Sequence, residues 1–177
     1  MRLPPLPADQ WDDQVQHALS GLLPRDRRNP AGAGNALATL VRHPDLTKAY
    51  SSLGVHLLFR STLPARAREL AILRVAHRRG CAYEWAHHVE MAGESGVTAA
   101  DIAAAQGGTP TEEFDRVIFA ATDELETTSN LSDSTWAALG AHLDERQCMD
   151  LVFTVGNYAM LAMAFNTFGV EVEQTER

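Results

Sequence analysis

The chain has 177 residues, of which 45% are apolar and 21% charged, enough for one domain with a hydrophobic core. Its formal net charge of -8, without a basic stripe, argues against binding to nucleic acid or to an anionic membrane surface, although an anionic substrate is not excluded. Two distant cysteines and a start, MRLPPLPADQW, without a charged-then-apolar signal pattern favour a cytoplasmic protein.

The hydrophobic pattern predicts an all-α fold, because no segment alternates as a strand does. We expect residues 1–45 to form an N-terminal helical extension and loop, with residues 46–177 as the main helical part of a single globular domain. The extension is predicted to hold helices at 9–22 and 35–42, separated by a loop rich in Pro and Gly. The helices predicted for the main part are 46–60, 64–79, 81–95, 98–106, 111–128, 133–142 and 144–168.

The last predicted helix contains twenty consecutive uncharged residues, Leu151 to Val170, which is long enough to span a membrane. Several polar residues interrupt this run, no basic residues flank it, and acidic residues follow it. We therefore interpret it as a central buried helix whose small and flexible residues also suit packing against a second subunit.

The predicted helix 64–79 carries apolar residues almost all round and must be largely buried. Glu69 lies among these apolar residues, and a carboxyl group held against hydrocarbon can donate or take a proton near neutral pH. The alternative is that Glu69 simply pairs with Arg66, three residues back. Gly80 is expected to end this helix in a left-handed conformation.

The next helix gathers reactive side chains on one face. Cys81, Glu84, Trp85 and His88 fall within about 100° of arc, whereas Tyr83 and His87 point elsewhere. A first-turn position is expected to lower the pKa of the Cys81 thiol, and Glu84 would oppose that effect.

Each residue also has a purely structural interpretation. Cys81 resembles a small buried hydrophobe, Glu84 a capping-box glutamate, and His88 a satisfied core histidine. Four titratable groups at one apolar junction are nevertheless costly to bury without a function.

These residues resemble the carboxymuconolactone decarboxylase superfamily, which includes the alkyl hydroperoxidase D-like proteins, over roughly Leu46 to Gly107. Glu69, Cys81 and His88 fall at the Glu, first Cys and final His positions of the family pattern, and Glu84 replaces the second Cys. The segment CAYEWAHH is closer to the decarboxylase branch. The resemblance implies an alkyl hydroperoxidase D-like helical bundle that assembles as a homo-oligomer, a trimer or hexamer.

By this resemblance, His88 is the leading general acid or base, Glu69 and Glu84 orient it or shuttle protons, and Cys81 is a pocket thiol. Tyr83 and Trp85 are predicted to contact substrate, and Arg66 or Arg74 to bind its carboxylate unless they are solvated helix arginines. Without a second cysteine nearby, a peroxidase would need an external thiol or the distant Cys148.

No cofactor is expected, because an acid and hydrogen-bond donors suffice for decarboxylating a lactone acid. Glu84 and His88 are spaced so that both could bind one ion, but the paired signature of a zinc helix is missing, and no metal is predicted.

Three functions stay open. The first is a cofactor-independent enzyme, a lyase of the carboxymuconolactone decarboxylase type or an isomerase, acting on a small carboxylated or lactone substrate. The second is an alkyl hydroperoxidase D-like antioxidant, with peroxiredoxin-type activity, that uses Cys81 and an external thiol. The third is a non-catalytic helical oligomer that binds a ligand.

Overall fold

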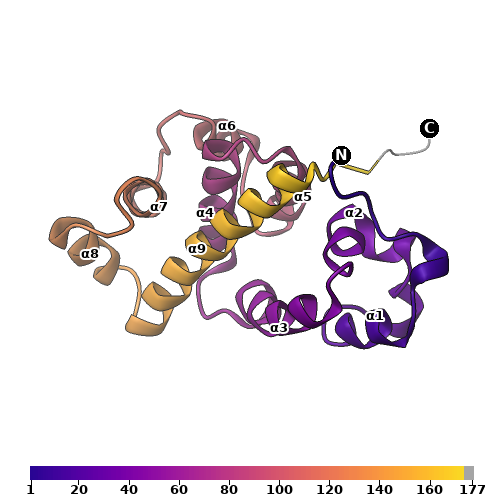
Figure 1. Cartoon of the computed structure of the whole chain (residues 1–177). Coiled ribbons are helices and arrows are strands. Elements are labelled where there is room, and N and C mark those ends of the chain that lie inside the picture. The colour runs from indigo at the N-terminus through magenta and orange to yellow at the C-terminus, as the bar shows by residue number, and fades with distance from the viewer. Residues whose placement is uncertain (174–177) are drawn as a thin grey trace. The chain divides into compact units, whose positions relative to one another are not determined.

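The structure is a computed structural model that describes residues 1–173. The predicted all-α class is confirmed, since this part of the chain contains helices and no strand (Figure 1). The α-helices are α1 (Asp13–Ala18), α2 (Pro30–Leu40), α3 (Pro44–Val55), α4 (Ala65–Arg78), α5 (Ala82–Glu94), α6 (Ala99–Ala105), α7 (Glu113–Thr128), α8 (Asp133–Gly140) and α9 (Glu145–Phe168). Short 3-10 turns occupy Ala8–Gln10 and Arg25–Arg27, and a π-helical turn occupies His56–Arg60.

The chain divides into two compact units at different places from the predicted division into 1–45 and 46–177. One unit combines Met1–Arg60 with the chain from Ala164 onward, and the other is Ser61–Met163. The C-terminal end joins the first unit because the backbone N–H groups of Arg2 and Leu3 both donate to the carbonyl of Phe168, at 2.7 and 3.0 Å.

The first unit has its own small core, in which α3 packs against α1 and α2. Its buried members are Leu6, Val15, Leu19, Ala33 and Val41. The helices are shorter or earlier than predicted, for local reasons. Asp12 accepts hydrogen bonds from Gln14 and Val15, so α1 starts only at Asp13.

Helix α2 starts five residues before the predicted helix at 35–42. Asn29 caps it by accepting from the N–H of Gly32, and Pro30 fits the first helical position. Gly34 then adopts φ 70° and ψ 170°, a left-handed conformation that kinks the helix. The residues after this kink form the helix that the sequence predicted.

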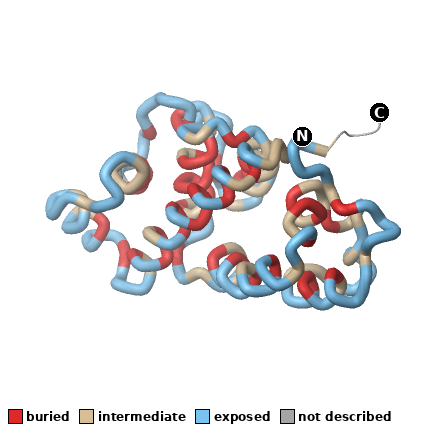
Figure 2. The backbone as a smooth tube through the Cα atoms, in the orientation of Figure 1, coloured by how far each residue is buried: buried red, intermediate tan, exposed pale blue. Residues whose placement is uncertain are grey.

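The second unit is built around α4, which packs against α5, α6 and α7. Figure 2 shows α4 buried along most of its length, as its apolar residues on all sides predict. Two other helices of this unit begin with side-chain caps: Thr98 and Asp101 form a capping box on α6, and Ser132 caps α8.

Helix α9 is long and apolar enough to cross a membrane by length and composition. Of the window that meets this test, 61% is buried inside the protein, as in the core helix of a folded domain. Leu151, Val155 and Ala162 are among its buried residues, whereas Met149 and Phe153 are exposed. The burial favours the core-helix interpretation made from the sequence.

Candidate active site

The site is organised by the sharp turn between α4 and α5. Gly80 has φ 58°, the left-handed conformation predicted for it, and its N–H donates to His77. The N–H of Cys81 donates to the carbonyl of Ala76 at 2.9 Å, which closes the end of α4. Cys81 is therefore the residue that caps α5 rather than part of its first turn, and α5 packs closely along α4.

Glu69 of α4 and His88 of α5 meet inside the protein. Nδ1 of His88 lies 2.7 Å from Oε2 of Glu69, and their exposed fractions are 6% and 0%. The expected meeting of this acid with this imidazole is thus present in the structure. A carboxylate that accepts from Nδ1 fixes the imidazole ring and leaves Nε2 as the atom that can exchange a proton with a ligand.

Two further residues hold this pair. Arg68 donates from Nε to Oε1 of Glu69 at 3.0 Å, so the buried carboxylate carries both a cation and an imidazole. Tyr158 of α9 packs its ring edge-on against His88, with 4.9 Å between the ring centroids. The imidazole therefore has a hydrogen-bond partner at Nδ1 and an aromatic ring packed against it.

Glu84 is also buried, but among residues 1–173 no cation or imidazole binds it as Arg68 and His88 bind Glu69. It is 3% exposed, and apart from the neighbouring Cys81 thiol neither carboxyl oxygen has a hydrogen-bond partner among residues 1–173. Burial raises the pKa of Glu84 to about 8, against the smaller lowering effect of the Cys81 thiol. At neutral pH this side chain is a protonated carboxylic acid, one turn before His88 on the same face of α5.

The thiol of Cys81 differs from the sequence expectation. Burial and the adjacent Glu84 carboxyl raise its pKa to about 12, although the backbone N–H groups of Glu84 and Tyr83 act in the opposite direction. The predicted lowering is therefore wrong. The physical reason is that the sulfur lies in the interior, only 1% of the residue being exposed, where the thiolate is poorly solvated.

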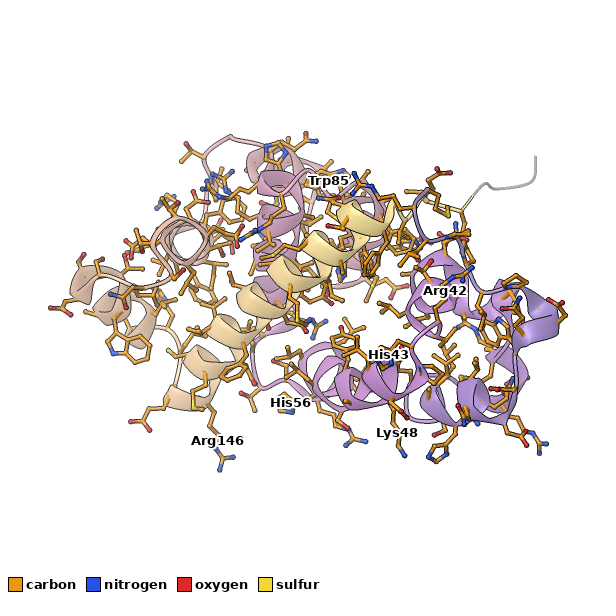
Figure 3. All side chains as sticks on the ribbon, in the orientation of Figure 1. Arg42, His43, Lys48, His56, Trp85 and Arg146 are labelled. Carbon is orange, nitrogen blue, oxygen red and sulfur yellow. The ribbon has the colours of Figure 1, made fainter. Side chains whose placement is uncertain are left out.

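Trp85 and Tyr83, both predicted to contact substrate, lie in different surroundings. Trp85 projects from α5 (Figure 3), packs edge-on against His77 at 6.1 Å, and lines a surface hollow of about 220 Å³ that also contains Cys81. Tyr83 instead lies against His87, with ring centroids 4.4 Å apart. The separation of Tyr83 from the face shared by Cys81, Glu84 and His88 agrees with the helical projection.

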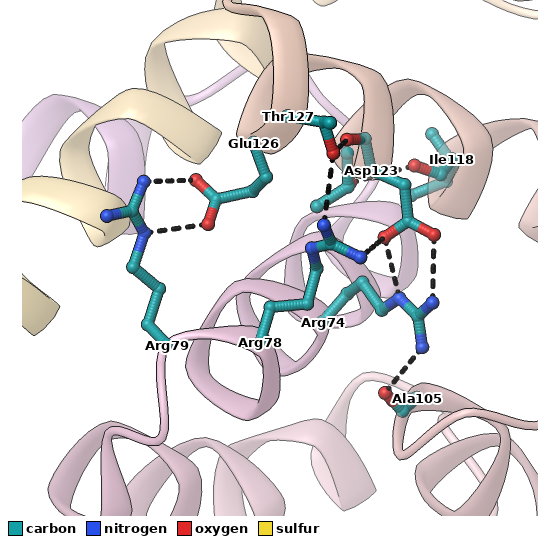
Figure 4. Close-up of polar contacts among 9 residues, drawn as sticks. Arg74, Arg78, Arg79, Ala105, Ile118, Asp123, Glu126 and Thr127 are labelled. Atoms are coloured by element: carbon teal, nitrogen blue, oxygen red, sulfur yellow. Dashed lines mark hydrogen bonds and ion pairs between the residues drawn. The ribbon is translucent and has the colours of Figure 1, made fainter.

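Arg66 and Arg74 connect helices. Arg66 binds Asp115 at 2.5 Å and Asp101 at 2.9 Å, so the alternative pairing of Arg66 with Glu69 is also absent. Figure 4 shows Arg74 forming two hydrogen bonds of 2.8 Å with Asp123. Their ion-pair partners raise the pKa of both guanidinium groups, and this geometry gives no support to substrate binding.

Arg68 and Tyr158 are the site residues that the sequence reasoning missed. Adjacent residues on a helix usually point in different directions, so Arg68 gave no sign that it would bind Glu69. Tyr158 is seventy positions after His88, and only the tertiary fold brings the two rings together. Within residues 1–173, no group of three or more His, Cys, Asp or Glu side chains is arranged to hold a metal ion.

Comparison with known proteins shows what this arrangement is similar to. The model of the carboxymuconolactone decarboxylase family matches residues 44–124, which include the whole site except Tyr158. Comparison with curated proteins gives no match.

Solved structures show the same fold at low sequence identity. An uncharacterized peroxidase-related protein from Ralstonia eutropha, described as an alkylhydroperoxidase AhpD core, aligns with TM-score 0.73 and 12% identity over 98% of this chain and 94% of its own. A peroxidase-related protein from Silicibacter gives 0.69 and 15% over 98% and 91%. A cysteine-to-alanine variant of the debrominase Bmp8, in complex with 2,3,4-tribromopyrrole, gives 0.71 and 17% over 98% and 92%.

The fold is thus that of the AhpD-like helical proteins. The stretch that matches the carboxymuconolactone decarboxylase family model, residues 44–124, contains Glu69, Cys81, Glu84 and His88.

Proposed function

We propose that this protein is a cofactor-independent enzyme that decarboxylates or isomerises a small carboxylated or lactone substrate by acid–base chemistry. The observation that carries the proposal is the contrast at α5: Glu84 is buried, which raises its pKa to about 8, whereas His88 one turn later is fixed by Glu69 at 2.7 Å. The site therefore combines a proton donor with an imidazole whose Nε2 can take a proton.

The reaction can be written with these groups alone. Loss of CO₂ breaks the bond between the carboxyl carbon and the lactone and leaves an electron pair that is delocalised into the carbonyl. Glu84 donates its proton to this carbon, and solvent later returns a proton to the Glu84 carboxylate. In an isomerisation, Nε2 of His88 removes a proton from the substrate before Glu84 supplies one at another carbon.

Turnover of carboxymuconolactone by full-length protein tests the proposal, with product formation and CO₂ release as readouts. We expect Glu84→Gln and His88→Ala each to lower kcat about a hundredfold or more, because each removes one partner in proton transfer. Cys81→Ser, which keeps the cavity nearly unchanged, should retain most activity. Wild-type protein that binds the lactone acid but does not turn it over would favour the non-catalytic binding function instead.

The antioxidant function is the second candidate, supported by the likeness to alkylhydroperoxidase-type structures. Its weakness is the thiol, because a pKa of about 12 leaves little thiolate at neutral pH to attack a peroxide. Consumption of cumene hydroperoxide with dithiothreitol, lost in Cys81→Ser but kept in Cys148→Ser, would favour this function over the lyase.

We also propose that the protein self-associates through an apolar stripe on α9. The stripe consists of Met149, Phe153, Gly156, Met160 and Met163, spaced alternately by four and three residues, and its four large side chains are 46–60% exposed. Such spacing lines one side of a helix and suits pairing with an identical helix. Because the stripe is uncharged in a chain of net charge -8, two copies can meet there without repulsion between like charges.

Sedimentation of the full-length protein tests this surface. Phe153→Glu together with Met160→Glu should convert the assembly to monomers. Trp136→Glu changes an exposed apolar residue on α8, outside the stripe, and should leave the assembly intact. A monomeric wild-type protein would contradict the proposal.

A further inference from the structure

A second concave site lies wholly in the first unit and includes none of the residues of the candidate active site. It is a hollow of about 280 Å³ whose polar lining consists of His17, Ser20, Lys48, Ser51, Ser52 and Arg60. Helix α3 contributes Lys48, Ser51 and Ser52 from one face, since they are spaced by three and four residues. This volume lies just below the usual range for ligand pockets, which begins at about 300 Å³.

The charges of this lining are all of one sign. Lys48 and Arg60 are cations, and no Asp or Glu lines the hollow. Within residues 1–173 neither cation has an ion-pair partner, whereas Arg66, Arg68, Arg74 and Arg79 of the second unit all bind carboxylates. The lining therefore holds two cations and no anion in a chain with 23 acidic and 15 basic residues.

The hydrogen bonds in the hollow leave donors free for a ligand. Nζ of Lys48 lies 2.7 Å from Nε2 of His17, and because an ammonium group has only donors, the imidazole nitrogen accepts. This contact fixes the lysine and uses one of its three hydrogens. The Ser52 hydroxyl and the Arg60 guanidinium make no hydrogen bond to another described residue, so they too are available as donors.

The nearest carboxylates do not neutralise this charge. Asp13 precedes His17 by four residues on α1, and Asp45 precedes Lys48 by three on α3, positions from which helical ion pairs form. Neither lines the hollow, and neither forms an ion pair in the described structure. Lys48 therefore keeps two ammonium hydrogens beyond its bond to His17, and Arg60 and Ser52 face the hollow without an acceptor among residues 1–173.

From these contacts we propose that the hollow binds the phosphoryl or carboxylate group of a small anionic ligand. Lys48 and Arg60 supply charge-assisted hydrogen bonds from two sides, and Ser52 supplies a third donor between them along the chain. This inference does not depend on the reaction proposed for Glu84 and His88, because it uses no residue of that site.

Isothermal titration calorimetry of the full-length protein tests the proposal, with inorganic phosphate and succinate as separate titrants. Ionic strength is kept constant with chloride, so that general screening does not change between titrations. We expect saturable binding of at least one of the two anions. Binding of phosphate alone identifies a phosphoryl site, binding of succinate alone identifies a carboxylate site, and binding of neither overturns the proposal.

Variants then locate the binding. Lys48→Ala and Arg60→Ala should each weaken binding about tenfold or more, because each removes a charged donor. Ser52→Asp should abolish binding, because it places a carboxylate in the hollow while both cations remain. Arg25→Ala removes the same charge from an exposed position of the first unit that does not line the hollow.

Unchanged binding in Arg25→Ala is the expected control result. Equal weakening in Arg25→Ala and in the two hollow variants would show diffuse attraction to the unit as a whole and would overturn the proposal. Circular dichroism of every variant separates loss of a donor from loss of fold.

Discussion

Helix α4 meets α6 and α7 on one side and α5 on the other. The charged groups near these two sides differ in whether they have partners. On the side that meets α6 and α7, Arg66 and Arg74 bind Asp115 and Asp123. On the side that meets α5, Glu69 is paired, but the nearby Glu84 is buried with an orphaned carboxyl group. Charged groups that have partners stabilise the contacts between helices. A buried polar group without a partner instead indicates where chemistry is expected.

The largest expected effect concerns the thiol beside Glu84. A pKa of about 12, against an ordinary value of 9.0, lowers the thiolate fraction near neutral pH about a thousandfold. In a Cys148→Ala background, alkylation of Cys81 by iodoacetamide should therefore be at least that much slower than alkylation of the unfolded chain, as followed by mass spectrometry. Glu84→Gln should speed the reaction by removing the adjacent carboxyl. Rapid modification of the folded wild type would show that this side of α5 is not the desolvated environment described above.

The pH dependence of the free energy of unfolding should distinguish Glu84 from the acids that have ion-pair partners. Its pKa is about 8 in the folded protein and near 4.5 in the unfolded chain, so the folded state retains a proton that the unfolded state releases. The associated stability is fully present below about pH 4.5, falls as pH rises, and levels off above about pH 8, for a total on the order of 5 kcal/mol.

Urea denaturation of wild type and Glu84→Gln, at several pH values across this window, measures that contribution. The variant should lose the downward slope, while the contributions of all other groups cancel in the difference. Parallel curves for the two proteins would mean that Glu84 is already ionised in the folded state.

A smaller effect is expected on the compensated side. Asp115→Ala leaves Arg66 with one partner fewer and should lower the free energy of unfolding by about 2 kcal/mol, less than for a fully buried pair because Arg66 is partly exposed. Glu112→Ala removes an acid that caps α7 without a side-chain hydrogen bond and should change stability little. Equal losses in the two variants would indicate that general charge, rather than this ion pair, stabilises the unit.

The smallest expected effect concerns Gly80, in the turn between α4 and α5. Gly80→Ala places a side chain at φ 58° in open space, so the expected cost is backbone strain alone, about 1 kcal/mol. Gly93→Ala is the matched control, because its new Cβ also meets nothing but lies in helical backbone, where alanine is favoured. Thermal unfolding distinguishes the two, and a neutral Gly80→Ala would mean that the turn relaxes freely.

Much of the fold followed from local signals. The helices over 65–78 and 82–94 begin and end within one residue of the predicted bounds, because Pro64, Gly80 and the apolar pattern act at short range. Helix α1 was predicted too long, since the pattern at 9–22 did not reveal that Asp12 caps a later start. The position of α2 was displaced because Gly34 kinks a helix instead of preceding one.

Only some features of the candidate site could be predicted from the sequence. A shared face for Cys81, Glu84 and His88 follows from helical geometry, and the meeting of Glu69 with His88 follows from a short turn between two helices. The roles of Arg66 and Arg74 could not be predicted, because their partners Asp115 and Asp123 lie 49 residues away in the sequence. Solvated and ion-paired arginines look alike in a sequence.

By itself, the sequence determined the all-helical class, the family resemblance and the set of titratable residues at one helix junction, because these depend on periodicity and spacing along the chain. Only the tertiary structure decided which of those groups have partners. Burial lifts the pKa values of Glu84 and Cys81 while Arg68 and Tyr158 hold the Glu69–His88 pair, and these effects arise from desolvation and from contacts between distant segments.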